Sequence, residues 1–315
     1  MNDLDPASSL LPYSLIVGQE ELRSALEIAY VSDAVGGVLA MAQRGTAKTT
    51  TVRAFTVMLT GELPVTLPIG ATDDRVLGGW KIDKLMEGKP EVQDGLLVEA
   101  SRSAAKILYI DEINLLDDYL VNIILDVVST GILNVQRDNL AEESVPARFT
   151  LVGTMNPDEG SLRPQLFDRF GLVAEVRPEN DEARRAEIME AVLTFHDDPD
   201  ATLVREARER DKAKRAALQE AKARVRDVGW APGTLAACAR LAGAFKLAGH
   251  RGELVLARAA RACAALDGDA EVTVAHVASI ARPALVHRRS NGDSGSLPAW
   301  EDEDRALVAE RLQGG

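Results

Sequence analysis

Cysteine and histidine are both scarce in this chain of 315 residues, which narrows the chemistry that it can carry. Only Cys238 and Cys263 occur, and both lie inside alanine-rich segments with helical spacing. Cysteines in such positions are expected to be small buried side chains, which argues against a disulfide framework or a cysteine metal site. The four histidines show no metal-ligand spacing, so we expect them at the surface or at helix ends.

Long apolar segments and an excess of positive charge are also missing. No run approaches the roughly 20 apolar residues that are needed to span a bilayer. The acidic N-terminus, MNDLDPASSLLPYSL, lacks the basic region and the long apolar core of a signal peptide, so we expect a cytoplasmic chain without membrane contact. The formal net charge of −13 argues against broad nucleic-acid binding.

An alternation of strand-like and helical segments is present between Val17 and about Val176. Such alternation predicts the α/β fold class, with a doubly wound and mostly parallel sheet. The segment 20–34 has apolar residues at helical spacing and is expected to be a connecting helix. The expected strands are GGVLAM (36–41), VTLPI (65–69), KILYIDE (106–112), RFTLVGTMN (148–156) and GLVAEV (171–176).

After residue 178 the strand signals stop, and charged, alanine-rich helical segments follow. Residues 181–226 predict long helices with a short break at 197–201, and residues 230–289 predict three more helices that form a compact lid. The stretch 205–226 is locally basic, which fits either a solvated helix face or an interaction surface.

Residues 42–49, AQRGTAKT, follow the pattern of a phosphate-binding loop, G-x-x-x-x-G-K-[ST], except at its glycines. Ala42 and Ala47 stand at the two glycine positions, while Lys48 and Thr49 are kept. Lys48 can neutralise β- and γ-phosphate oxygens, and Thr49 can offer its hydroxyl to Mg²⁺. The segments on either side fit a buried strand and a helix whose N-terminal amides surround the phosphates.

Ala47 is the riskier replacement, because glycine at its position allows backbone angles that other residues avoid. If Ala47 holds an ordinary negative φ, we expect the loop to bind phosphate without penalty. If the position needs a positive φ, we expect strain on the order of 1 kcal/mol, which would weaken ATP binding without abolishing it.

Polar side chains follow two further strand-like segments. Asp111 and Glu112 come directly after the buried run 107–110, and Asn156 ends the next strand-like segment. Nucleotide sites in open α/β sheets form at the carboxyl ends of the strands. We therefore expect Asp111 to hold Mg²⁺ through water and Glu112 to orient or deprotonate the attacking water. The neutral amide of Asn156 can orient water beside the γ-phosphate without adding charge.

Two arginines fit roles at a nucleotide shared between subunits. Arg169 follows a short helical turn at the edge of the sheet domain, where it cannot easily reach its own nucleotide but could reach a neighbour's. The alternative for Arg169 is a salt bridge with Asp168 or Glu175. Arg251 begins a lid helix between two glycines and could contact nucleotide from the lid, whereas Arg258 fits a structural role better.

Taken together, these motifs resemble the AAA+ ATPases, and specifically the ATPase subunit (I-subunit) family of magnesium chelatase. The resemblance covers about residues 13–290, and the block 146–172 is its most specific part. The matching segments are IVGQEELRSAL (16–26), RGTAKTT (44–50), LPIGATDDRVLGG (67–79), GLLVEAS (95–101), LYIDEINLLDD (108–118), PARFTLVGTMNPDEGSLRPQLFDRFGL (146–172) and HRGELVLARAARACAAL (250–266).

The resemblance implies an organisation and a set of partners. Residues 1–178 would form the AAA+ nucleotide-binding αβα domain, with hairpin insertions near 70–95 and 131–147. Residues 179–290 would form a helical linker and lid domain. Beyond the resemblance, the polar composition of the next residues and an acidic amphipathic segment predict that residues 291–315 form a polar linker and a short C-terminal helix. The family also implies ATP and Mg²⁺ as cofactors, a homo-oligomer in the form of a hexameric ring, a separate von Willebrand A domain protein and, in chelatases, a large porphyrin-binding subunit.

The resemblance also assigns a role to each matching site residue. Lys48 and Thr49 correspond to Walker A, Asp111 and Glu112 to Walker B, Asn156 to sensor 1, Arg169 to the arginine finger and Arg251 to sensor 2. The residues expected to contact ATP are Arg44, Gly45, Thr46, Ala47, Lys48, Thr49, Thr50 and Arg251. Those expected to act in catalysis are Glu112, Asn156 and Arg169, and those expected to hold the Mg²⁺ of Mg-ATP are Thr49 and Asp111.

Two functions stay open at this point. One is ATP-driven metal insertion into a tetrapyrrole, as in magnesium or cobalt chelation. The other is a remodelling ATPase of the same clade, similar to the MoxR-type chaperones, which acts with a von Willebrand A partner and without metal insertion. A scaffold that binds nucleotide without hydrolysis is disfavoured, because Asp111, Glu112, Asn156 and Arg169 are all present.

Overall fold

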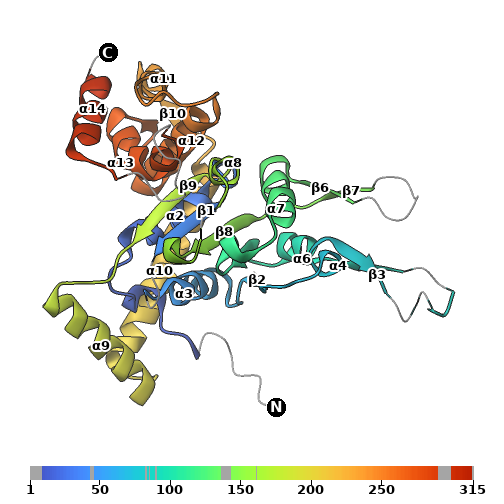
Figure 1. Ribbon diagram of the computed structural model, residues 1–315. Coiled ribbons are helices and arrows are strands. Elements are labelled where there is room, and N and C mark those ends of the chain that lie inside the picture. The colour runs from blue at the N-terminus through green and yellow to red at the C-terminus, as the bar shows by residue number, and fades with distance from the viewer. Residues whose placement is uncertain are drawn as a thin grey trace.

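A five-stranded parallel sheet forms the centre of the computed structural model (Figure 1). The structure describes residues 9–42, 46–81, 84, 86–88, 91–135, 143–160, 162–289 and 299–313, and the predicted ATP contacts Arg44 and Gly45 lie outside them. In sheet order the strands are β2 (Val65–Leu67), β5 (Ile107–Ile110), β8 (Thr150–Met155), β1 (Val38–Ala42) and β9 (Leu172–Val176).

Alternate side chains of the inner strand β1 enter two separate hydrophobic cores. Val38, Ala40 and Ala42 pack with one cluster of buried residues, and Leu39 and Met41 pack with the other. Successive side chains of a strand point to opposite faces of the sheet, so a strand covered by helices on both faces must be apolar throughout. This requirement explains the uninterrupted apolar runs in the sequence.

Helices cover both faces of the sheet. On one face α2 (Glu20–Val31) and α3 (Lys48–Thr60) share the core that extends into the helical domain. On the other face α6 (Leu96–Arg102), α7 (Asp118–Thr130) and the short α8 (Pro164–Phe167) bury their apolar residues. The predicted α/β architecture with a parallel sheet is therefore confirmed.

Two antiparallel hairpins extend from one side of the sheet domain, away from α11–α14 (Figure 1). Both fall within the segments in which hairpin insertions were expected. The first pairs β3 (Gly78–Trp80) with β4 (Val92–Asp94), and a short helix, α4 (Asp73–Leu77), precedes it. The second pairs β6 (Ile132–Val135) with β7 (Glu143–Pro146).

The described residues after β9 are mostly helical. Asp198 ends α9 as its C-cap and Ala201 precedes α10 as its N-cap, so the predicted break between two long helices is present. None of the helices within the described ranges combines the length and the apolar composition needed to cross a membrane. The elements are α9 (Glu182–Asp197), α10 (Thr202–Arg224), α11 (Thr234–Ala244), α12 (Arg251–Asp267), α13 (Val274–Leu285) and α14 (Asp302–Gln313), with a two-stranded pair formed by β10 (Gly229–Trp230) and β11 (Glu271–Val272).

The helical domain is held together largely by alanine. Helix α12 buries Ala259, Ala260 and Ala262 completely, and small side chains allow its neighbours to approach closely. Helix α14, which was expected to follow a linker, packs against α11 and α13 and so joins this core. Cys238 is buried and Cys263 is half-buried, and both are free thiols, in agreement with small apolar side chains.

Two histidines differ from the expectation of surface positions. His276 caps the start of α13, where its Nδ1 accepts a hydrogen bond from the Thr273 amide at 3.0 Å, and the residue is only 6% exposed. His287 lies just beyond α13 and is 8% exposed. Both sit at helix ends, but they are buried because these ends face the core and not the solvent.

Candidate nucleotide site

The phosphate loop connects the carboxyl end of β1 to the start of α3, which begins at Lys48. The Gln19 side-chain amide donates to the Thr46 carbonyl at 2.8 Å and holds the loop against the start of α2. Lys48 turns back toward the strand, and its Nζ donates to the Ala42 carbonyl at 2.9 Å. Burial lowers the pKa of Lys48, and the carboxylates of Asp111, Glu112 and Glu159 partly offset this effect.

Ala47 adopts a left-handed backbone conformation, with φ of 56° and ψ of 20°. Of the two possibilities left open for this position, the strained one holds, since a Cβ in this region costs energy. Gln19 and Glu112 also have positive φ, at 63° and 52°. Backbone strain of this kind tends to gather at functional sites, and three of the five described non-glycine residues with positive φ lie in the loop, beside it or at the neighbouring strand end.

The carboxyl end of β5 brings Asp111 to Thr49, as the sequence suggested. The Thr49 hydroxyl lies 3.4 Å from Asp111 Oδ2 and 2.9 Å from the Tyr109 hydroxyl. Tyr109 in turn donates to Asp111 Oδ1 at 3.0 Å. Thr154 donates to that same oxygen and accepts from the Glu112 amide at 3.0 Å. Two hydroxyl groups therefore fix the direction of the Asp111 carboxylate.

Sequence reasoning missed Tyr109 and Thr154. Tyr109 is two residues before Asp111 and so shares its face of the strand, which is a signal that the sequence contained. Burial raises the pKa of Tyr109 to about 12, which keeps its hydroxyl protonated as a donor. Thr154 comes from β8, where Gly153 pairs with Ile110, so its proximity to Asp111 depends on strand order and register.

Asn156 and Glu112 lie at the ends of neighbouring strands on the same edge of the sheet. Met155 of β8 pairs with Met41 of β1, which places Asn156 beside the beginning of the phosphate loop. The Asn156 side chain is 4% exposed, and its Oδ1 accepts from the Asp158 amide at 3.2 Å. This bond leaves its NH₂ group as a donor for water or phosphate oxygen.

A cavity of about 930 Å³ adjoins the phosphate loop. Its lining includes Thr46, Ala47 and Thr50 from the loop and the first turn of α3. Other lining residues come from the segment 15–21 before and at the start of α2, from the carboxyl end of β9 and its continuation, and from α9. Leu11, Arg282, Trp300 and Arg305 complete the lining. A volume of this size is in the range that holds a small ligand such as a nucleotide.

Arg169 and Arg251 lie at the opposite edge of the sheet, where the strands begin. They line a second cavity, of about 950 Å³, together with Gly36, which precedes β1, and Phe149, which precedes β8. Because the strands are parallel, this amino edge faces away from the phosphate loop. The two arginines are therefore brought close to each other and separated from Lys48.

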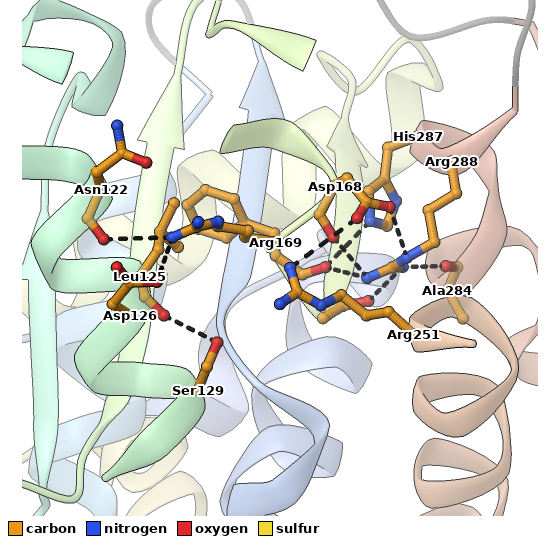
Figure 2. A network of polar contacts seen from close by, with 12 residues as sticks. Asn122, Leu125, Asp126, Ser129, Asp168, Arg169, Arg251, Ala284, His287 and Arg288 are labelled. Atoms are coloured by element: carbon orange, nitrogen blue, oxygen red, sulfur yellow. Dashed lines mark hydrogen bonds and ion pairs between the residues drawn. The ribbon is translucent and has the colours of Figure 1, made fainter. Parts of the chain in front are cut away.

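The ion pairs of this region differ from those expected (Figure 2). Arg169 pairs with Asp126 of α7, and its Nη1 lies 3.5 Å from the Asn122 carbonyl, so the predicted alternative partners Asp168 and Glu175 are wrong. Asp168 instead faces Arg251, at 3.9 Å. Arg258 donates to the Ala34 carbonyl at 2.9 Å, in keeping with its structural assignment. Arg288, which the sequence did not single out, reaches the loop that carries Arg169.

Comparisons with known proteins agree with this geometry. A family model described as "AAA domain (dynein-related subfamily)" matches residues 39–170, and one described as "AAA lid domain" matches residues 235–310. The chain is 39% identical to the magnesium-chelatase 38 kDa subunit of Chlorobaculum parvum, over 94% of this chain and 96% of that protein. The chain belongs to the magnesium-chelatase I-subunit family of AAA+ ATPases.

Two other relatives and one solved structure are also similar to this chain. The 38 kDa subunit of Rhodobacter capsulatus magnesium chelatase is 40% identical over 89% of this chain and 88% of that protein. An uncharacterized protein of Mycobacterium tuberculosis is 41% identical over 88% of this chain, which spans 44% of that protein. A solved model of the complex between subunits BchI and BchD of magnesium chelatase covers 96% of this chain, with a TM-score of 0.50, 37% identity and 99% of its own chain matched.

As an AAA+ ATPase of this family, the chain uses ATP and Mg²⁺. The donors at the carboxyl edge fit Mg-ATP. A hydroxyl and a carboxylate, from Thr49 and Asp111, are hard oxygen ligands on one side of a site. Mg²⁺ keeps several waters and takes one or two protein ligands beside the phosphates of a nucleotide, so two such ligands are enough.

Proposed function

We propose that the chain works as a ring-forming ATPase in which each ATP lies between two copies. The carboxyl edge of one copy would supply Lys48, Thr49, Asp111, Glu112 and Asn156. The amino edge of the next copy would supply Arg169 and Arg251. The observation that supports this proposal is the separation of the two groups at opposite edges of one parallel sheet. A closed ring, with six copies as the family implies, would complete every site by a head-to-tail contact.

The proposed roles follow from the chemistry of each side chain. ATP supplies the phosphoanhydride bond, and Mg²⁺ neutralises charge on its phosphates. Lys48 binds β- and γ-phosphate oxygens, and Glu112 orients or deprotonates the attacking water. Asn156 orients that water without adding charge. Arg169 and Arg251 stabilise charge that develops on the transferred group.

The ion pair of Arg169 is suited to such an exchange of partners. The Asp126 side chain is 65% exposed, and exposed ion pairs contribute little free energy because water and salt screen them. A polyphosphate brought up by a neighbouring copy carries more negative charge than one carboxylate and can form bidentate bonds with guanidinium. Arg169 can therefore leave Asp126 at little cost.

We further propose that the ATPase acts with a separate von Willebrand A domain protein and a large porphyrin-binding subunit to insert a metal ion into a tetrapyrrole. Similarity to chelatase subunits over nearly the whole chain supports this function. The likeness to a chain of a complex between BchI and BchD supports a partner subunit. A remodelling ATPase without metal insertion is the second candidate, since the ATPase site by itself does not specify what the ATPase acts on.

Mixed rings test the shared site. Glu112→Gln should abolish turnover while nucleotide still binds, and Arg169→Ala should do the same. When the two variants are mixed, some interfaces combine an intact carboxyl edge with an intact amino edge, so ATP turnover should partly return. Light scattering with and without nucleotide would report assembly. Full turnover by Arg169→Ala alone would contradict the proposed role of Arg169.

A reconstitution separates the two candidate functions. The chain would be combined with its von Willebrand A partner and a candidate large subunit, and metalloporphyrin formation would be followed by absorbance. Metal insertion that requires ATP and intact Glu112 is expected for the chelatase function. Steady ATP turnover without metallation, across the plausible large subunits, would favour the remodelling function.

A further inference from the structure

Arg288 is a buried cation in the part of the helical domain that touches the sheet. It ends a short 3₁₀ turn (Val286–Arg288) that directly follows α13. Its side chain is 2% exposed. Charged side chains are rarely buried to this degree unless neighbouring groups form hydrogen bonds or ion pairs with them.

The guanidinium of Arg288 is directed at the short loop that carries Arg169 (Figure 2). Nη2 donates to the Asp168 carbonyl at 3.1 Å and also to the Phe170 carbonyl. Nη1 donates to the Gly171 carbonyl at 3.1 Å and to the carbonyl of Ala284 in α13. The contacts thus enclose Arg169 from both sides in sequence, with bonds to the residue before it and to the two after it.

The loop carries one carboxylate, and two arginines of the helical domain share it. Arg288 Nε lies 3.5 Å from Asp168 Oδ1, and Arg251 Nη1 lies 3.9 Å from Asp168 Oδ2. Burial lowers the pKa of Arg288 to about 10, with Asp168 opposing and Arg251 adding to the effect, so the group stays charged at neutral pH. His287 adds one more tie, because its Nε2 lies 3.1 Å from the Phe170 carbonyl.

This arrangement joins the helical domain to the backbone beside Arg169 by rigid geometry. A guanidinium presents its donors in a fixed planar fork, so carbonyls that bind it are held at fixed relative positions. The Ala284 carbonyl ties that same fork to α13. Any displacement of α13 relative to the sheet must therefore be transmitted to the loop 168–171.

We propose that Arg288 is a positioning residue for Arg169: it sets the place of the arginine that each copy offers to its neighbour's ATP. The inference rests on the proposed sharing of the site between copies. Arg288 would act through the backbone of the loop and not on the nucleotide directly. Its consequence is that movement of the helical domain in one copy changes hydrolysis in the next copy, through the loop 168–171.

The test replaces Arg288 with methionine, which has similar length and no donors. The Arg288→Met chain should bind ATP within about twofold of wild type, because its own phosphate loop is untouched, while kcat falls about a hundredfold through misplacement of Arg169. Arg288→Lys should give an intermediate kcat with unchanged KM. Arg224→Met is the matched control, since Arg224 also donates to a lid carbonyl, that of Ala265 at 2.8 Å, but does not contact the Arg169 loop.

Mixing then shows where the defect lies. Arg288→Met chains mixed with Glu112→Gln chains should regain part of the turnover, as expected for Arg169→Ala in the same mixture. A kcat for Arg288→Met within twofold of wild type, or a loss that mixing does not restore, would overturn the positioning role. If Arg288→Met does not fold, wild-type kcat in Arg288→Lys overturns it instead. Full turnover by Arg169→Ala alone would contradict the proposed sharing of the site, and the inference about Arg288 would then fail as well.

Discussion

Replacing Ala47 with glycine tests whether the phosphate loop is strained before ATP arrives. At φ of 56° the Cβ of an alanine costs about 1–2 kcal/mol, which glycine removes. Glycine also lowers the free energy of unfolding by about 0.4–1 kcal/mol, because it gives the unfolded chain more conformational freedom. The hydrogen bond that the Thr51 side-chain hydroxyl donates to the residue 47 carbonyl, at 3.0 Å, should persist in the variant. The net expectation is a gain of about 0.5–1 kcal/mol in the free energy of unfolding.

Two measurements distinguish an effect of the strain on the stability of the fold from an effect on ATP affinity. Thermal unfolding of Ala47→Gly should show a Tm about 1–3 °C higher than wild type, the shift expected for a gain of this size in a chain of this length. ATP affinity, measured by calorimetry, should stay within about twofold, because a conformation that exists in both free and bound chains cancels from the binding free energy. This outcome would differ from the weakened binding that the sequence alone suggested.

Ala42→Gly is the matched control, because it alters the other glycine position of the same loop. Ala42 ends β1 and is 5% exposed, and it is absent from the described residues with positive φ. Glycine there should lower stability by about 0.5–1 kcal/mol, as in any strand interior. An equal Tm change in both variants would falsify the strain argument. So would ATP binding tightened tenfold by Ala47→Gly, since the free loop would then have to differ from this structure.

Two other variants test the surroundings of the site. Tyr109→Phe removes a hydroxyl that orients Asp111 and contacts Thr49, and it should raise the Mg²⁺ concentration for half-maximal turnover roughly tenfold, with the fold unchanged. Burial lowers the pKa of His287 well below its ordinary value of 6.5, so only the unfolded chain takes up its proton as the pH falls. The stability that His287 contributes is therefore present above about pH 6.5 and lost below it. The fall in Tm between about pH 7 and pH 5 should be smaller in His287→Gln, and an identical fall would contradict neutral burial of His287.

The candidate site residues at the carboxyl edge of the sheet were predictable, because each belongs to a motif that is contained in a short segment of the sequence. An apolar strand followed at once by a polar residue identifies Asp111 and Asn156, and parallel strands bring such residues to one edge. Tyr109 was missed, although its spacing on the same strand could have identified it. Thr154 could not be identified, because the strand order β2-β5-β8-β1-β9 departs from chain order and the sequence does not state which strands pair.

The amino edge was harder to predict because it depends on how the helical domain docks. Helical spacing identifies the buried face of α12 but not which end of the sheet that face approaches. This docking determines that Arg251 lies beside Asp168. It also determines that Arg288 and His287 are buried. Ala47 shows a further limit of pattern reasoning: the motif marks the position, but only backbone geometry decides whether alanine is strained there.

If the nucleotide site is shared between copies as proposed, the placement of its two halves at opposite ends of one sheet has a consequence for cells that make this protein. A lone copy would hold one half of a catalytic centre at each end and a complete centre at neither. Specific activity should then rise with protein concentration and vanish on dilution. Newly made copies would hydrolyse no ATP until their concentration was high enough for them to assemble. The amount of protein in the cell would therefore control when the ATPase becomes active.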